Sequence, residues 1–301
     1  MKYGYLLSYY VSSLVARKRP LLAGIKLTYA CNLKCVHCPF RCRQGGPLSF
    51  SQVTTAMERL RGMGVKILII EGGEPFLWKD DELGLADIVR AAKRMFPLVG
   101  VTTNGTFPLE VECDIVWVSV DGMKTTHDRI RGESFERILA NIETSSHQRI
   151  YAHVTVNSLN WSEVAALVKF LASRVEGITF QFHYPYAEVS EDLVLPFNLR
   201  AKVLDGLLRL KRDGLPVADS SACLQALKGN QWRCRPWMIA NVDPDGRITH
   251  GCYVKGRGDV SCERCGFSAH AEISLAYGGS VGAMRAGHRI FFNQRRSNAC
   301  A

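Results

Sequence analysis

Short apolar runs alternate with helical patterns along most of the chain. The runs predict strands at residues 25–30, 65–70, 98–103, 114–120, 150–156 and 177–183. Helical patterns are found at 49–61, 80–95, 134–143, 161–173 and 199–212. Six strand–helix units in series predict an α/β fold with a parallel sheet and right-handed crossovers. Periodicity alone does not choose between a flat doubly wound sheet and a curved partial barrel.

Three cysteines follow the first predicted strand. Cys31, Cys35 and Cys38 are separated by three and then by two residues. Thiolates on such a short loop can hold three irons of a cubane cluster and leave the fourth iron open to a small chelating molecule. Spacing alone also leaves open a zinc site or a chance group of buried thiols.

Polar and glycine-rich motifs follow the next predicted strands. Gly72-Gly73-Glu74-Pro75 comes after the second strand, and two glycines let the backbone approach a ligand closely. Asn104-Gly105 ends the third strand, where such a pair is also typical of a plain turn. In parallel barrels, functional groups gather at the carboxyl ends of strands.

The ends of the later strands carry further candidates. Strand alternation puts Ser119 and Asp121 on one face, and Asn157 ends the fifth strand. His183 and Tyr184 follow the sixth strand and are candidates for the substrate side. For His183, the alternative is a core histidine whose ring is hydrogen-bonded to the backbone. His127 and Arg131, in the segment after Asp121, are interpreted as structural.

The order of these motifs resembles the radical S-adenosylmethionine (radical SAM) superfamily. The resemblance implies a partial (β/α)6 barrel and an enzyme in which Cys31, Cys35 and Cys38 hold a [4Fe–4S] cluster. S-adenosylmethionine binds its open iron and is cleaved reductively to a 5′-deoxyadenosyl radical. This radical abstracts hydrogen from, or adds to, an unactivated carbon, and a donor such as flavodoxin or ferredoxin supplies the electron. The cofactor contacts implied are Gly72, Gly73, Glu74, Asn104, Ser119, Asp121 and Asn157.

A second set of cysteines lies where the strand–helix alternation has stopped. Cys234, Cys252, Cys262 and Cys265 could ligate either zinc or a second [4Fe–4S] cluster, and spacing does not choose. The extension resembles the twitch and SPASM appendages of the superfamily, which implies an auxiliary cluster, with zinc as the alternative. Cys223 is a possible substitute ligand. We expect three regions: residues 1–23, a barrel over 24–214, and a cysteine-rich extension over 215–301.

A weaker resemblance concerns the two ends of the chain. The basic segment Arg17-Lys18-Arg19-Pro20 and residues 262–270 are similar to the adenosylhopane synthase group. This likeness implies an isoprenoid or membrane-lipid substrate. It also implies a peripheral contact of the N-terminal helical pattern with the inner face of the membrane. Peptide or small-metabolite maturation is the alternative within the superfamily. Outside it, the alternative is a non-catalytic iron–sulfur or zinc protein that transfers electrons or serves as a scaffold.

Composition indicates the cellular compartment of the chain and the kinds of partner that it can bind. No run approaches the ~20 apolar residues of a membrane span. Eleven cysteines in close motifs, without secretory features, favour metal ligation in a reducing cytoplasm over disulfides. The net charge of +10 is compatible with an anionic partner. Charge alone gives little reason to expect nucleic-acid binding.

Overall fold

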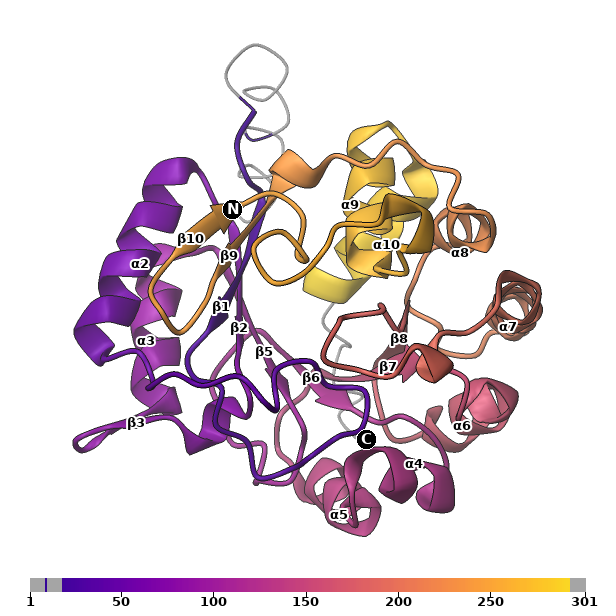
Figure 1. Cartoon of the computed structure of the whole chain (residues 1–301), viewed down its shortest axis with the longest axis horizontal. Coiled ribbons are helices and arrows are strands. Elements are labelled where there is room, and N and C mark those ends of the chain that lie inside the picture. The colour runs from indigo at the N-terminus through magenta and orange to yellow at the C-terminus, as the bar shows by residue number, and fades with distance from the viewer. Residues whose placement is uncertain (1–8, 10–17, 293–301) are drawn as a thin grey trace, which may run out of the picture.

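The computed structural model describes Tyr9 and residues 18–292. Its main element is a sheet that contains six parallel strands in chain order (Figure 1). These strands are β1 (Leu22–Lys26), β2 (Ile67–Glu71), β5 (Leu98–Thr103), β6 (Ile115–Ser119), β7 (Ile150–Val156) and β8 (Gly177–Phe182). Each crossover adds the next strand on the same side, so the sheet is wound in one direction. This order is that of an open barrel and excludes a doubly wound sheet.

Helices cover the outer face of the curved sheet (Figure 1). They are α2 (Phe50–Met63), α3 (Leu85–Met95), α4 (Lys124–Arg131), α5 (Phe135–Thr144), α6 (Val164–Leu171) and α7 (Phe197–Arg212). Ser49 caps α2 through a capping box with Gln52. The connection from β5 to β6 carries no helix, so the strand–helix alternation is less regular than predicted. Single-turn 3-10 helices are η1 (Pro75–Leu77), η2 (Trp161–Glu163), η3 (Glu191–Leu193), η4 (Pro236–Met238) and η5 (Cys262–Arg264).

The helix predicted over 80–95 begins later, at Leu85. A small hairpin, β3 (Lys79–Asp80) and β4 (Leu83–Gly84), takes up its first residues. The carboxylate of Asp80 accepts a hydrogen bond from the Phe50 N–H at 2.7 Å, so it serves the start of α2 instead. Asp81 has a φ of 49°, a conformation that interrupts a right-handed helix.

The C-terminal part continues the sheet. It forms α8 (Ser221–Lys228), β9 (Ile239–Val242), β10 (Ile248–His250), α9 (Ser268–Tyr277) and α10 (Val281–Phe292). Strand β9 pairs in parallel with β1, and β10 pairs antiparallel with β9. Helices α8, α9 and α10 pack together beside β8 (Figure 1). The composition of the chain changes near residue 214, but the same sheet contains strands from both sides of that point. The division into three regions stays a prediction.

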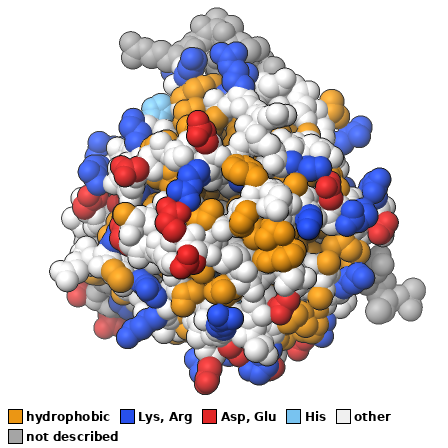
Figure 2. Space-filling view, turned by 45° about the vertical axis from the view of Figure 1, so that its right-hand side comes forward, with side chains coloured by type: hydrophobic (Ala, Val, Ile, Leu, Met, Phe, Trp, Pro, Cys, Tyr) orange, Lys and Arg blue, Asp and Glu red, His pale blue; other side chains and the backbone are white. Residues whose placement is uncertain are grey.

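Two sequence expectations concern the N-terminal residues and membranes. Apart from Tyr9, residues 1–17, with the predicted N-terminal helix and Arg17, lie outside the described residues. In the part of the chain that is described, no helix combines the length and the hydropathy needed to cross a bilayer. On the face drawn in Figure 2, basic and acidic side chains are interspersed with hydrophobic ones.

Candidate active site

The loop that follows β1 brings the three cysteines to the mouth of one large cavity. Cys31, Cys35 and Cys38 all line this cavity, whose volume is about 930 Å³. The Cys31 Sγ accepts hydrogen bonds from the Leu33 N–H at 3.4 Å and from the Asn104 amide at 3.7 Å. Burial raises the pKa of Cys35 to about 11, although the nearby Arg131 guanidinium acts in the opposite direction. The thiols therefore lie in a protected pocket at the carboxyl end of the sheet, as the motif predicts.

The turn after β2 is hydrogen-bonded to the start of the cysteine loop. The Gly73 N–H donates to the Thr28 carbonyl at 2.6 Å, and the Glu74 N–H donates to the Ala30 carbonyl at 2.8 Å. A Cβ on Gly73 would lie 2.2 Å from the Ala30 carbonyl oxygen, so no larger residue fits. Gly72 and Gly73 also line the cavity. The two glycines thus hold the loop in place and offer backbone to a ligand.

Glu74 lies behind this turn, away from the cavity. Its carboxylate accepts hydrogen bonds from the Thr103 hydroxyl and the Asn104 N–H, each at 2.7 Å, and from the Phe76 N–H at 3.1 Å. Burial raises its pKa to about 7, against the lowering effect of these donors. The carboxylate is fully buried and joins the end of β2 to the end of β5. This geometry assigns Glu74 a bracing role instead of direct contact with a cofactor.

Asn104 faces the cavity and joins two loops. Its side-chain amide donates to the Asn32 Oδ1 at 2.8 Å, besides its contact with the Cys31 sulfur. Its Oδ1 accepts hydrogen bonds from the Thr106 N–H at 2.9 Å and from the Thr106 hydroxyl at 2.7 Å. The Asn-Gly turn therefore fixes the cysteine loop from the β5 side.

Asp121 is fully buried behind the cysteine loop. Its Oδ2 lies 2.5 Å from the Arg131 Nε and 3.6 Å from the His37 Nε2. Its Oδ1 accepts the Thr155 N–H at 2.7 Å. Burial favours the neutral acid, but Arg131, His37 and the backbone donor outweigh it, so its pKa lies below the ordinary value. Asp121 does not line the cavity; it positions Arg131 and His37, which do.

Arg131 was interpreted from the sequence as structural, but it also reaches the cysteines. Its guanidinium Nη1 lies 3.9 Å from the Cys35 Sγ while its Nε pairs with Asp121. In the helix that carries it, α4, the Ile130 carbonyl accepts a hydrogen bond from the Val36 N–H at 2.9 Å. A buried cation beside a thiolate favours the ionised form that metals bind. No spacing signal in the sequence connects residue 131 with residue 35.

The remaining predicted contacts divide between the cavity and its support. Ser119 lines the cavity and is mostly buried. Asn157 does not: its Oδ1 accepts the Leu159 N–H at 2.9 Å and its amide donates to the Thr155 carbonyl at 3.3 Å. Asn157 thus shapes the turn after β7.

His183 and Tyr184 lie on the cavity wall opposite the first strands. The His183 Nε2 is buried and has no hydrogen-bond partner among the described residues. Burial lowers its pKa to about 4, so the imidazole is neutral at pH 7. The Tyr184 hydroxyl donates to the Asp259 carbonyl at 2.6 Å and accepts the Ser261 N–H at 2.6 Å. His183 can therefore contact a ligand, whereas the Tyr184 hydroxyl is already used.

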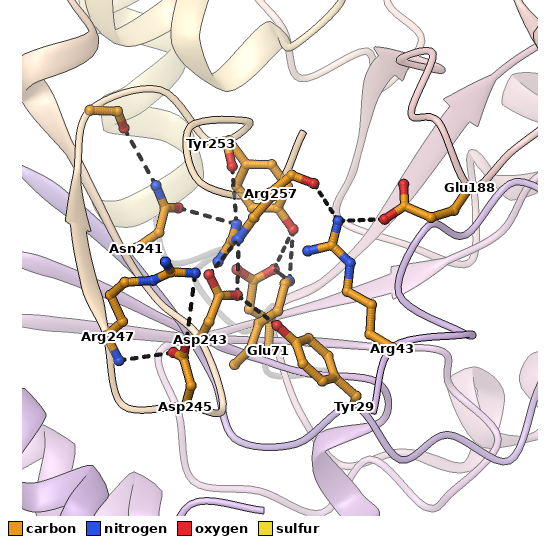
Figure 3. Close-up of polar contacts among 12 residues, drawn as sticks. Tyr29, Arg43, Glu71, Glu188, Asn241, Asp243, Asp245, Arg247, Tyr253 and Arg257 are labelled. Carbon is orange, nitrogen blue, oxygen red and sulfur yellow. Dashed lines mark hydrogen bonds and ion pairs between the residues drawn. The ribbon is translucent and has the colours of Figure 1, made fainter. Parts of the chain in front are cut away.

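A buried polar group on β1, β2 and the C-terminal extension was missed by the sequence reasoning. The Lys26 Nζ lies 3.0 Å from the Glu71 carboxylate and donates to the Tyr253 hydroxyl at 2.7 Å. That hydroxyl in turn donates to Glu71 at 3.4 Å (Figure 3). Burial lowers the pKa of Lys26, against the raising effect of Glu71. All three side chains line the cavity.

A second buried ion pair supports this group (Figure 3). The Arg257 Nε lies 3.0 Å from each carboxylate oxygen of Asp243, and both side chains are almost fully buried. The Arg257 carbonyl accepts a hydrogen bond from Arg43, whose guanidinium also pairs with Glu188 at 2.9 Å. The barrel, the cysteine loop and the extension are therefore joined by one network of charges.

The four C-terminal cysteines lie close enough to affect one another. Burial raises the pKa of Cys234, and Cys252 and Cys262 raise it further. Cys252 and Cys234 likewise add to the raised pKa of Cys265, which is about 11 mainly because of burial. Cys223 lies apart from them: its thiol contacts the Ser268 carbonyl at 3.6 Å and lies beside Asp219 and Glu272. The structure brings the predicted set together and separates the substitute ligand from it.

Comparison with known proteins identifies the family. Residues 25–171 match the model of the Radical SAM superfamily. This match covers the cysteine loop, the glycine turn and the ends of β5, β6 and β7. This part of the chain belongs to the radical SAM superfamily. The curated proteins that this chain resembles include some named as synthases and some named as maturases.

Two curated relatives illustrate the range of radical SAM enzymes. The chain is 27% identical over 223 residues to Fe-coproporphyrin III synthase of Methanosarcina barkeri, covering 66% of this chain and 54% of the relative. It is 31% identical over 189 residues to pre-heme d1 synthase of Dinoroseobacter shibae, covering 58% of this chain and 46% of the relative. The chain therefore spans about half the length of these curated relatives.

Solved structures confirm the fold. The radical SAM chain resembles Streptococcus suis SuiB bound to S-adenosylmethionine with a TM-score of 0.62 at 13% identity, covering 79% of this chain and 61% of SuiB. SuiB bound to the precursor peptide SuiA gives a TM-score of 0.64 at 12% identity, and the match covers 84% of this chain and 65% of SuiB. At this identity the likeness concerns the fold, which is the predicted α/β partial barrel.

Proposed function

We propose that this enzyme cleaves S-adenosylmethionine reductively at a [4Fe–4S] cluster held by Cys31, Cys35 and Cys38. The observation that carries the proposal is the placing of these three thiols, with no further cysteine from the described residues, around one cavity of about 930 Å³. Three thiolates leave one iron of a cubane for the cofactor. When bound, the cluster supplies the electron that breaks the sulfonium bond and yields a 5′-deoxyadenosyl radical.

The residues around the thiols fit this role. The backbone of Gly72 and Gly73 and the side chains of Asn104 and Ser119 line the space beside the loop and can bind the cofactor's polar groups. Arg131 stabilises the Cys35 thiolate, and Asp121 holds Arg131. The barrel encloses the space in which the radical acts and shields it from water. A reducing donor such as flavodoxin or ferredoxin would supply the electron.

We also propose that Cys234, Cys252, Cys262 and Cys265 hold a second, fully ligated [4Fe–4S] cluster. Zinc draws its sulfur ligands to within about 4 Å of one another, because each Zn–S bond is about 2.3 Å long. In the described part of the chain, the one group of three or more His, Cys, Asp or Glu residues whose ligand atoms all lie within 4.8 Å of one another is Asp219, Cys223 and Glu272. No three of the four thiols fall within that distance, which is wider than the spacing that a single bound zinc ion imposes.

The substrate stays a proposal. SuiB was solved with a precursor peptide, which favours the peptide-maturase alternative, while the names of the two curated relatives point to porphyrin-type products. The isoprenoid or lipid substrate, a cytoplasmic location and a contact of the N-terminal segment with the inner face of the membrane have no support from these relatives.

Electron paramagnetic resonance tests the open-iron site directly. The protein is reconstituted anaerobically with iron and sulfide and reduced, and the Cys265→Ala variant isolates the signal of the first cluster. We expect S-adenosylmethionine to shift this signal, because it binds the open iron. In the Cys35→Ala variant we expect the cofactor-sensitive signal to be lost and the C-terminal metal to remain. A signal that ignores the cofactor would favour an electron-transfer or scaffold protein.

A further inference from the structure

The inner wall of the barrel changes in character from one end to the other. Alternate residues of each strand face the cavity, and the register places Lys26 beside Glu71, Gly24 beside Ile69, and Leu22 beside Ile67 and Ile239. The wall is therefore charged near the cysteine loop and apolar toward the start of the strands. In closed (β/α)8 barrels, layers of side chains fill this interior.

Here no side chain from Tyr9 or residues 18–292 fills the apolar layer. Leu22, Ile69 and Trp117 point inward from β1, β2 and β6, yet each is only half-buried, while their neighbours along the strands are mostly buried. Helices α9 and α10 complete the wall with Ile273, Ala283 and Gly287. A Cβ added to Gly287 would meet no heavy atom within 4 Å. We call the space lined by these six residues the apolar arm.

Helix α10 packs against the starts of β6 and β7. Phe291 packs against Trp117 with ring centroids 5.9 Å apart, and Ile290 is buried with Ile115 and Tyr151 at the start of β6 and β7. Arg149 donates hydrogen bonds to the Phe291 carbonyl at 3.0 Å and to the Ile290 carbonyl. Helix α10 is therefore held in place as one wall of the apolar arm.

Two carboxyl groups border the arm but are occupied. Asp219 accepts the Phe180 N–H at 2.8 Å, and Glu272 accepts the Ser220 hydroxyl at 3.1 Å. Burial and the neighbouring Glu272 raise the pKa of Asp219 to about 7. Both carboxyl groups are therefore already bound by groups of the protein.

We propose that the apolar arm binds the hydrocarbon chain of an amphiphilic small-molecule substrate, with the polar end of that molecule toward Lys26 and Tyr253. This inference rests on the proposed function for its chemistry and narrows the substrate class. A hydrocarbon chain gains free energy from each methylene that leaves water. A peptide segment in the arm would instead lose hydrogen bonds of its backbone, which costs free energy. The wall thus favours a chain over a polypeptide.

Calorimetry with simple fatty acids tests the arm without any turnover. Octanoate, decanoate and dodecanoate are titrated, below micelle formation, into the full-length reconstituted protein without reductant or S-adenosylmethionine. We expect binding to tighten about fourfold with each added methylene. Gly287→Phe places an aromatic ring in the arm, at a position with free space for a side chain. This variant should weaken dodecanoate binding by at least about tenfold.

Gly282→Phe is the matched control on the same helix. Gly282 is exposed, lies outside the cavity wall, and its added Cβ would be 3.9 Å from the Ser280 hydroxyl. This variant should bind dodecanoate like the parent. Leu22→Ser provides a second test by removing apolar surface, and circular dichroism checks that each variant is folded.

Three results would overturn the inference: no dependence on chain length, equal weakening by the two phenylalanine variants, or binding of coproporphyrin III in the arm without binding of dodecanoate. Because the titration needs neither electron nor cofactor, its outcome is independent of the proposed function. Chain-dependent binding in a protein that never cleaves S-adenosylmethionine would refute the proposed function and leave the arm in place.

Discussion

At the scale of the residue, several motif side chains support the site from behind. Asp121 and Glu74 are fully buried and outside the cavity wall, whereas Arg131 and His37 line it. The sequence predicts which polar residues lie at the ends of the strands. The direction in which each side chain points depends on partners far along the chain. Asp121 faces Arg131 because α4 brings the guanidinium back toward the cysteine loop.

The Arg131–Asp121 pair gives a prediction for stability. Arg131→Met should lower the free energy of unfolding by about 3–5 kcal/mol, because it leaves the buried Asp121 carboxylate without its cation. Urea unfolding of the reconstituted protein measures this change. Adding Asp121→Asn to the variant should restore part of the loss, since the buried charge is then gone. Equal losses in the single and double variants would contradict the pairing.

Gly73 gives a prediction for the cysteine loop. Gly73→Ala should displace the loop, because the added Cβ would lie 2.2 Å from one backbone carbonyl oxygen and 2.5 Å from another. We expect iron bound at the first site to fall severalfold while iron at the C-terminal set is retained. Gly62→Ala, where an added Cβ meets nothing within 4 Å, is the control and should keep both. Full iron content in Gly73→Ala would show that the turn does not position the loop.

At the scale of the element, the serial strands were the most predictable part. Strands β5 and β7 match the predicted ranges, because their apolar runs are bounded by clear polar residues. Strand β9 was not predicted: four residues, Ile239–Val242, carry too little pattern in a segment rich in cysteine, glycine and arginine. Its pairing with β1 depends on contact across more than two hundred residues.

Helices α8 and α9 meet β8 through a buried carboxyl pair, which predicts a pH dependence. The folded-state pKa of Asp219 is about 7, above its ordinary value of 3.8, because of burial and Glu272. A raised pKa means that this group's contribution to stability is full below about pH 4 and is lost as the pH rises through about 7.

Asp219→Asn should flatten this dependence. In the parent, this group should lower the free energy of unfolding by up to about 1.4 kcal/mol per pH unit between pH 4 and pH 7. Chemical unfolding at several pH values in that window compares the two slopes. The variant keeps an oxygen that can accept the Phe180 N–H. Identical slopes in parent and variant would show that Asp219 is ionised throughout.

At the scale of the whole molecule, the two cysteine sets belong to one body. Tyr253 follows Cys252 in the extension, yet its hydroxyl accepts a hydrogen bond from the Lys26 ammonium group of β1. Residues 26 and 253 are 227 positions apart, so no local pattern could have paired them. Spacing in the sequence marked each set as metal ligands, while the cavity beside the first set emerges only from the folded barrel.

The most direct test of the account is the formation of 5′-deoxyadenosine. The full-length protein is reconstituted anaerobically, given a reductant and S-adenosylmethionine, and the products are separated by chromatography. We predict 5′-deoxyadenosine from the parent and from Gly282→Phe, and none above background from Cys35→Ala. A parent protein that holds its cluster but forms no 5′-deoxyadenosine would contradict the central claim.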